Sequence, residues 1–295
     1  MGALTVMNDI YDYVQAEFAK MQLGYRTLTV EERDKWILFV LEHIKGLDAT
    51  NMAGRKRIHE WQDGWKNNSI NDIFIPRYFG KYPVVRMGNE FVTSTESKFL
   101  ALEYCTFTAI QRYIFPKYIS KVSYAYEFGC GTGHNLLRIS AANTKLESIV
   151  GLDWVDSSLD NISGISKFLD NVSGRKFNMF EPDYSYKLNA DSVVCTVASM
   201  EQLGTDFQKF FDYLLANRPR YVIHIEPINE LLNPESNLLD YLSVNYAKKR
   251  NYLDGYLDFL RTMEGRGLLN VICAMRSYVG SLFIDGYSIV VWECV

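Results

Sequence analysis

The sequence predicts an α/β protein in which a mostly parallel sheet carries helices on both faces. Two apolar runs support this fold class: residues 124–128, and residues 148–152, which lead into Asp153. Between them lie a turn with three alternate glycines and an apolar stripe at helical spacing. A strand, a glycine turn, a helix and a second strand in this order are typical of the unit that opens a nucleotide-binding α/β domain.

The first 119 residues predict a helical N-terminal extension. Residues 5–46 have the apolar spacing of two helices, and residues 97–115 that of a third, which Pro116 would end. The segment from 51 to 83 is rich in aromatic and basic residues. We expect it to be either a lid that brings His59 and Trp65 to a substrate or a surface helix whose tryptophans pack on the core. The N-terminal helices could equally form a homodimer interface.

The glycine turn is suited to a polar ligand. Glycine has no Cβ, so the backbone N–H groups of the turn can approach a ligand, and the helix that begins near His134 adds unpaired N–H donors. Asp153 suits the hydroxyls of a ribose, and Trp154 could cover an adenine. Glu127 would repel a pyrophosphate but pair with an ammonium group. This combination favours S-adenosylmethionine over the dinucleotide of an oxidoreductase, whose usual turn is G-x-G-x-x-G.

These residues together resemble the class I S-adenosylmethionine-dependent methyltransferases. Glu127-Phe-Gly-Cys-Gly-Thr-Gly133 is similar to the first motif of that family and Asp153 to the acid that closes its second strand, and the resemblance covers about residues 120–295. It implies a Rossmann-like domain of seven strands, the last one antiparallel, with S-adenosylhomocysteine as the product. Motifs in the third and fourth strands would complete the cofactor site. The residues expected to bind the cofactor are Glu127, Gly129, Cys130, Gly131, Gly133, His134, Asp153, Trp154, Asn178, Met179 and Thr196.

The catalytic residues are expected beyond the carboxyl ends of the strands, where open parallel sheets bind their ligands. The fifth strand, residues 220–227, carries His224 and Glu226 to this edge, and Glu230 follows it. A carboxylate there could accept a proton from a hydroxyl, or hold an amino or guanidino group. Glu226 could instead cap a loop, and His224 could instead be a core histidine. Our candidate catalytic residues are Glu226, Glu230 and His224.

The acceptor would meet further side chains. Residues 237–264 predict one long helix, whose basic triplet beside tyrosines suits an acidic group on the acceptor or is a solvated face. The loop after the fourth strand adds a carboxylate. Our candidate substrate-binding residues are Glu201, Tyr246, Arg250, Tyr252, His59 and Trp65. The histidines and cysteines lack partners at metal-site spacing, so we expect no metal.

Composition narrows the range of partners. A net charge of −4 and a pI near 5.7 disfavour nucleic acid as a partner. With no long apolar run and no signal peptide, we expect a cytoplasmic protein without membrane contacts. We expect methyl transfer to oxygen or nitrogen of a small polar metabolite, with oxygen favoured, for example a sugar or natural-product hydroxyl. The alternatives are N-methylation of an amino or guanidino compound held by Glu226 and Glu230, and a non-catalytic cofactor-binding module.

Overall fold

The computed structural model describes residues 2–66, 75–76, 78–95 and 100–295. Its centre is a seven-stranded sheet with the order β6-β5-β4-β7-β8-β11-β9. Strand β11 is antiparallel to both neighbours, and the other pairings are parallel, which confirms the predicted sheet. The strands are β4 (Tyr124–Phe128), β5 (Ser148–Asp153), β6 (Val172–Lys176), β7 (Ser192–Val197), β8 (Tyr221–Glu226), β9 (Leu269–Met275) and β11 (Ser288–Cys294).

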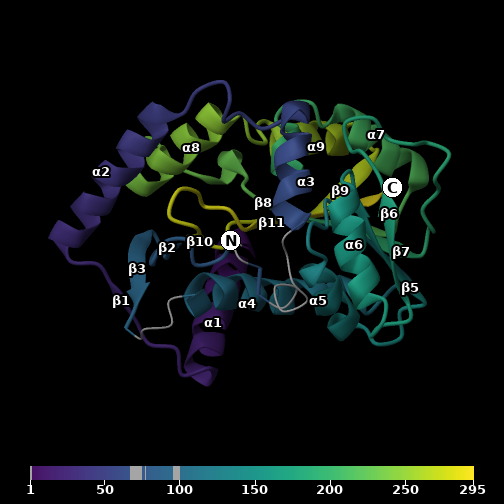
Figure 1. Ribbon diagram of the computed structural model, residues 1–295, viewed down its shortest axis with the longest axis horizontal. Coiled ribbons are helices and arrows are strands. Elements are labelled where there is room, and N and C mark those ends of the chain that lie inside the picture. The colour runs from purple at the N-terminus through teal and green to yellow at the C-terminus, as the bar shows by residue number, and fades with distance from the viewer. Residues whose placement is uncertain (1, 67–74, 77, 96–99) are drawn as a thin grey trace.

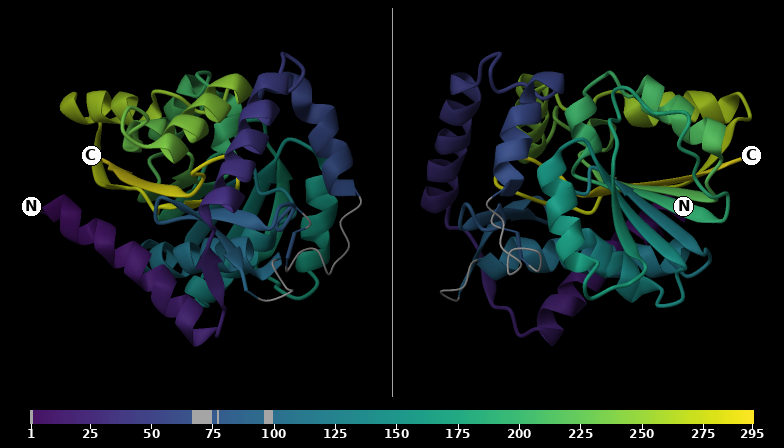
Figure 2. Two further views of the ribbon diagram at one scale, coloured as in Figure 1. Left: turned by 90° about the vertical axis from the view of Figure 1, so that its left-hand side faces the viewer. Right: turned by 45° about the vertical axis from the view of Figure 1, so that its right-hand side comes forward.

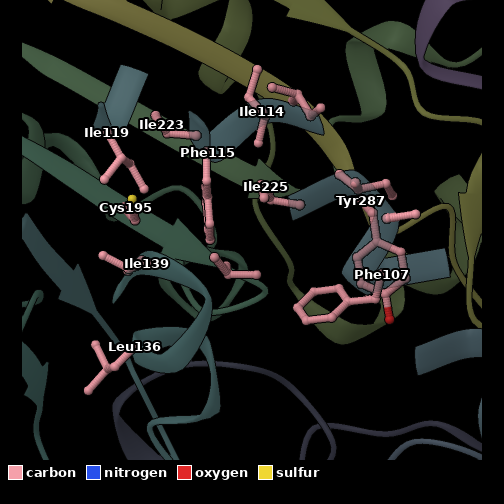
Figure 3. Packing of buried hydrophobic residues seen from close by; sticks show 14 of the residues in the cluster. Phe107, Ile114, Phe115, Ile119, Leu136, Ile139, Cys195, Ile223, Ile225 and Tyr287 are labelled. Atoms are coloured by element: carbon pink, nitrogen blue, oxygen red, sulfur yellow. The ribbon is translucent and has the colours of Figure 1, made fainter. Parts of the chain in front are cut away.

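Helices cover both faces of this sheet (Figure 1, Figure 2). One face packs on α1 (Gly2–Lys20), α4 (Leu100–Ile119), α5 (His134–Ala142) and α6 (Asp156–Ile165), and the other packs on α7 (Gln208–Asn217) and α9 (Tyr256–Gly265). Successive strand residues point to opposite faces, so Ile223 and Ile225 join the first layer while Val222 joins the second. Figure 3 shows Phe115 and Ile119 of α4 packed among side chains of α5, β7 and β8.

The N-terminal extension is only partly helical, because it also forms a small antiparallel sheet of order β1-β3-β2-β10. Gly88 and Asn89 turn β2 into β3, with φ of 60° and 68°. The fourth strand, β10, comes from the connection between β9 and β11. The C-terminal half of the chain therefore completes a sheet of the N-terminal part. The strands are β1 (Tyr25–Thr27), β2 (Val84–Met87), β3 (Glu90–Ser94) and β10 (Val279–Gly280).

A third core joins α2 (Val30–Gly46) to α8 (Leu238–Arg250), which lie side by side in Figure 1. Helix α2 begins with a capping box, in which Thr29 and Glu32 each bond the other's backbone N–H. Within the described residues, no helix combines the length and the apolar character that crossing a bilayer requires.

Two predicted helix boundaries were wrong. Residues 237–264 form two helices, α8 and α9, because Asn251 and Gly255 adopt φ of 52° and 73° and end one helix before the next begins. Pro116 lies inside α4 and does not end it. The remaining elements are α3 (Ile58–Lys66) and the short 3₁₀ helices η1 (Arg55–Arg57), η3 (Met200–Leu203) and η4 (Asn229–Leu231).

Candidate active site

The glycine turn between β4 and α5 requires its glycines. Gly129, Gly131 and Gly133 have φ of 70°, 53° and 78°. A Cβ on Gly129 would lie 2.4 Å from the Cβ of Ser199, and one on Gly131 would lie 3.2 Å from the ring of Trp65. The turn is thus packed between the loop after β7 and helix α3, and only glycine has both the conformation and the size to fit there.

Asp153 fastens the turn to the end of β5. Its Oδ2 accepts a hydrogen bond from the N–H of Gly131 (2.9 Å), and its Oδ1 accepts one from the N–H of Val155 (3.2 Å). Burial raises the pKa of Asp153, and these backbone donors oppose that shift. The carboxylate therefore stands at the edge of the sheet, beside the turn, as the sequence predicts.

Two cavities meet at the turn. The smaller, of about 70 Å³, is lined by Trp61, Trp65, Gly129, Gly131, Asp153, Trp154, Phe177, Asn178, Met179, Phe180, Ala198, Ser199, Gln202 and Leu203. The larger, of about 590 Å³, shares Gly129 and Gly131 of the turn with the smaller and falls in the usual size range of ligand sites. Both cavities are lined by Trp61, Trp65, Gly129, Gly131 and Ala198.

Helix α3 covers the junction between the cavities. Trp61 and Trp65 stack with their ring centroids 5.5 Å apart and their planes at 25°. The helix is fixed to α6 by Gln62, whose Oε1 accepts hydrogen bonds from the N–H groups of Asp156 (3.0 Å) and Ser157 (3.5 Å). The lid interpretation of this segment is thus compatible with the position of Trp65. His59, by contrast, is exposed and lines neither cavity.

The smaller cavity has an aromatic wall. The rings of Trp154 and Phe180 lie 5.6 Å apart with their planes tilted by 33°. Asn178 Oδ1 accepts a hydrogen bond from the N–H of Phe180 (3.0 Å), and its NH₂ group can only donate. Asp153 lines the same cavity.

Glu127 of β4 lines neither cavity itself, and only one of its two carboxylate oxygens has a hydrogen-bond partner among the described residues. Its side chain is fully buried, Oε1 accepts a hydrogen bond from Asn135 Nδ2 (2.6 Å), and Oε2 has no partner among the described residues. Burial raises the pKa of Glu127 to about 8. Oε2 thus lacks the donor that a buried carboxylate oxygen ordinarily meets.

The larger cavity contains one carboxylate that is poised near neutral pH. Burial, reinforced by the neighbouring charge of Glu226, raises the pKa of Glu201 to about 8. Gln202 Nε2 donates to Glu201 Oε1 (3.0 Å), and Tyr246 and Tyr252 line the cavity beside it. Arg250 lies behind these tyrosines, with its guanidinium 6.0 Å and 5.3 Å from their ring centroids, and is not part of the lining.

The other end of the larger cavity is aromatic. Phe107 contacts Phe79 and Tyr287 at centroid distances of 5.2 Å and 5.1 Å, and Figure 3 shows Phe107 and Tyr287 next to each other. Within this wall, His134 Nδ1 lies 3.2 Å from Thr132 Oγ1, and Nε2 is buried without a partner among the described residues. Burial lowers the pKa of His134 to about 3, so the ring is neutral.

Glu226 does not line either cavity, which corrects its expected catalytic role. Its carboxylate is fully buried and accepts hydrogen bonds from the N–H groups of Ser199, Met200 and Glu201 at 2.9 to 3.2 Å. Glu226 caps the loop after β7, and this loop carries Glu201 to the cavity. Burial raises its pKa to about 7, and the backbone donors oppose that shift.

His224 and Glu230 also lie outside both cavities, so their catalytic roles are corrected as well. His224 is a core histidine: Nδ1 lies 2.8 Å from Thr196 Oγ1, and Nε2 lies 2.8 Å from Tyr256 Oη and 3.1 Å from Trp292 Nε1. Thr196, which we expected to bind the cofactor, contacts His224 through its hydroxyl and lines neither cavity. Glu230 accepts a hydrogen bond from a backbone N–H at the start of α9 (2.8 Å).

Of the other predicted residues, Cys130 and His134 line the larger cavity, and Gly133 packs on α6, where a Cβ would lie 2.7 Å from Ile165. The sequence reading missed several lining residues. Some stand in the aromatic and basic segment and carried a compositional signal; Phe107 and Tyr287 had no local signal, because they meet only in the fold. The missed residues of the larger cavity are Arg57, Glu60, Trp61, Gly64, Tyr78, Phe79, Phe107, Thr132, Asn135, Val197, Ala198, Ser281, Ile284, Gly286 and Tyr287, and those that line only the smaller cavity are Phe177, Phe180, Ser199, Gln202 and Leu203.

No protein-family model matches the chain, and no curated protein matches its sequence. Solved structures do match. Geranyl diphosphate C-methyltransferase from Streptomyces coelicolor, in complex with S-adenosyl-L-homocysteine, aligns with a TM-score of 0.53 at 13% identity over 82% of this chain and 99% of that one. N-methyltransferase NodS from Bradyrhizobium japonicum aligns with a TM-score of 0.51 at 8% identity over 81% and 99%. The chain has the class I S-adenosylmethionine-dependent methyltransferase fold.

Proposed function

We propose that this fold serves S-adenosylmethionine-dependent methyl transfer to an oxygen or nitrogen atom of a small molecule held in the larger cavity. The observation that carries the proposal is the junction of two cavities at the glycine turn. One cavity has aromatic rings and a carboxylate, groups that could contact a base and a ribose, and the other has room for an acceptor. A bound S-adenosylmethionine would supply an activated methyl group at that junction.

The protein contributes mainly position and exclusion of water. Asp153 would hold the ribose and the unpartnered Oε2 of Glu127 the ammonium group, while Trp61 and Trp65 line both cavities where they meet. When bound, S-adenosylmethionine would supply a methyl group for displacement from sulfur, and these residues would hold it beside the acceptor. Glu201 would take the proton of the acceptor, since a pKa of about 8 lies close to working pH and a base is most effective there.

For a hydroxyl acceptor and for an amino acceptor alike, we assign to Glu201 the role that the sequence predicts for Glu226 and Glu230. A hydroxyl acceptor requires a base, and Glu201 is a carboxylate of the larger cavity with a pKa near neutrality; we therefore keep oxygen as the first expectation. An amino compound would instead be held by Glu201 together with Glu60, which lines the same cavity. The rings of Phe79, Phe107 and Tyr287 favour an acceptor with an apolar face over one that is polar throughout.

A screen for acceptors tests this function. Methyl-labelled S-adenosylmethionine is incubated with the protein and a panel of phenols, sugars and amines, and the labelled product is counted. With an acceptor from the screen, Glu201→Gln should lower kcat about a hundredfold or more and leave S-adenosylhomocysteine affinity unchanged, because only the proton acceptor is lost. Glu60→Gln is the matched control and should keep most of the turnover of a hydroxyl acceptor. Equal turnover of Glu201→Gln and the wild type would remove Glu201 from the mechanism, and tight cofactor binding with no turnover of any acceptor would favour the non-catalytic module.

A further inference from the structure

Three polar side chains form a buried series that ends at the cofactor site. Gln111 of α4 donates from Nε2 to Asn135 Oδ1 (2.7 Å), and Asn135 of α5 donates from Nδ2 to Glu127 Oε1 (2.6 Å). Their exposed fractions are 1%, 3% and 0%, so water does not compete for these hydrogen bonds. The series crosses from the helix that precedes the first central strand to the residue that precedes the glycine turn.

The order of donors in this series is determined by the carboxylate. Beside a bound ammonium group Glu127 is ionised and only accepts, so Asn135 turns its NH₂ group toward Glu127 and its oxygen away from it. That oxygen needs a donor in a buried place, and Gln111 provides it. If both amides were reversed, Asn135 Oδ1 would face Glu127 Oε1, and two acceptors would repel each other.

The series leaves one oxygen of the carboxylate for a ligand. Glu127 Oε1 is taken by Asn135, whereas Oε2 is buried and has no partner among the described residues. An unpaired carboxylate oxygen in such a place is costly unless a cation or donor meets it. Asn135 itself lines the larger cavity, so the series reaches the ligand space directly.

We propose that Gln111 is a positioning residue for the amino-acid end of the cofactor: it orients Asn135, which in turn holds Glu127 so that Oε2 meets the ammonium group. This inference rests on the proposed function. It also assigns a part of the cofactor site to the N-terminal extension, since Gln111 precedes the segment that resembles methyltransferases. Gln111 touches no ligand itself and acts only through Asn135 and Glu127.

Two ligands that differ in the amino-acid end test the proposal. S-adenosylhomocysteine carries the ammonium group, and 5′-methylthioadenosine lacks the whole amino-acid moiety. Calorimetric titration of the full chain should show that Gln111→Met weakens the affinity for S-adenosylhomocysteine about ten- to hundredfold. The affinity for 5′-methylthioadenosine should change by less than about twofold. Thr108→Val is the matched control, because Thr108 is a buried polar residue of the same helix outside the series, and it should leave both affinities unchanged. Gln111→Ala provides a second variant if Gln111→Met does not fold.

The outcomes separate this inference from the proposed function. A selective loss of S-adenosylhomocysteine affinity supports the positioning role. Equal losses for the two ligands would mean that Gln111 only supports the fold, and unchanged affinities would mean that it does not act on the site; either result overturns the inference alone. A wild-type protein that binds neither adenosyl ligand overturns the proposed function, and the inference with it.

Discussion

Glu226 and Glu201 show how far reasoning from single residues extends. Both are carboxylates at the carboxyl edge of the sheet, as the strand rule predicts. The sequence favours Glu226, because it ends a strand. In the fold, however, backbone N–H groups of the loop after β7 donate to Glu226, and the same loop places Glu201 in the lining of the larger cavity. Glu226 and its donors are separated by 25 to 27 positions in the sequence, so no local sequence pattern predicts these hydrogen bonds.

The loop-capping role of Glu226 predicts a large stability effect. Glu226→Ala removes the acceptor of three backbone N–H groups in a buried place, so the free energy of unfolding should fall by about 3 kcal/mol in urea denaturation. Glu230→Ala is the control and should cost about 1 kcal/mol, because Glu230 accepts a single backbone hydrogen bond. Equal effects of the two substitutions would contradict this role.

At the scale of elements, strands and glycine turns were predictable and remote pairings were not. The apolar runs that became β4, β5 and β8 are local signals of the sequence. Strands β1 and β10 of the small sheet have only three and two residues. Their partners are distant in the sequence: Tyr25 pairs with Ser94, and Val279 pairs with Met87. The predicted end of α4 at Pro116 was wrong because the sequence rule considers only the N–H that proline lacks. The core contacts of Phe115 and Ile119, which stabilise the last turn, are not local in the sequence.

Helix α3 provides a prediction about an element. Gln62 supplies the cap of α6 from another helix, so Gln62→Ala should lower the free energy of unfolding by about 1 kcal/mol and loosen α3. Hydrogen–deuterium exchange should then rise in residues 58–66, and S-adenosylhomocysteine affinity should fall, because Trp61 and Trp65 no longer close the junction. Gln208→Ala, which removes only an exposed contact with Asp212, is the control. Unchanged exchange in α3 would show that Gln62 does not dock it.

At the scale of the whole molecule, buried acids make stability depend on pH. Glu127 and Glu201 have pKa values of about 8 and Glu226 one of about 7 in the folded protein, against an ordinary value of 4.5, so the folded state holds more protons at neutral pH. His134 and His224, with pKa values of about 3 against 6.5, have the opposite effect, which is half lost at pH 6.5 and nearly gone by pH 8. Stability should therefore fall as pH rises above 6.5.

Urea denaturation of the ligand-free protein at two pH values measures this effect. Between pH 6.5 and pH 8 the free energy of unfolding should fall by about 3 kcal/mol. In Glu127→Gln the fall should be about half as large, because one of the two acids with a pKa of about 8 no longer titrates. A stability that rises over this interval would mean that these carboxylates are ionised in the folded protein.

The architecture joins the two parts of the chain more closely than the sequence indicates. The seven strands and the antiparallel last strand follow from the resemblance of residues 120–295, but β10 extends the N-terminal sheet, and α4 contributes Phe107 to the larger cavity. The proposed boundary between residues 119 and 120 thus lies at the end of α4, within a shared core. The homodimer interface, the cytoplasmic location and the identity of the acceptor stay predictions.

Cofactor binding is the central claim, and calorimetric titration with S-adenosylhomocysteine tests it most directly. The wild type should bind it with micromolar affinity and bind NADH much more weakly. Asp153→Ala should weaken the affinity for S-adenosylhomocysteine about a hundredfold. Asp156→Ala, which removes an exposed carboxylate three residues away, should leave this affinity unchanged. Unchanged affinity in Asp153→Ala, or NADH binding more tightly than S-adenosylhomocysteine, would contradict the account.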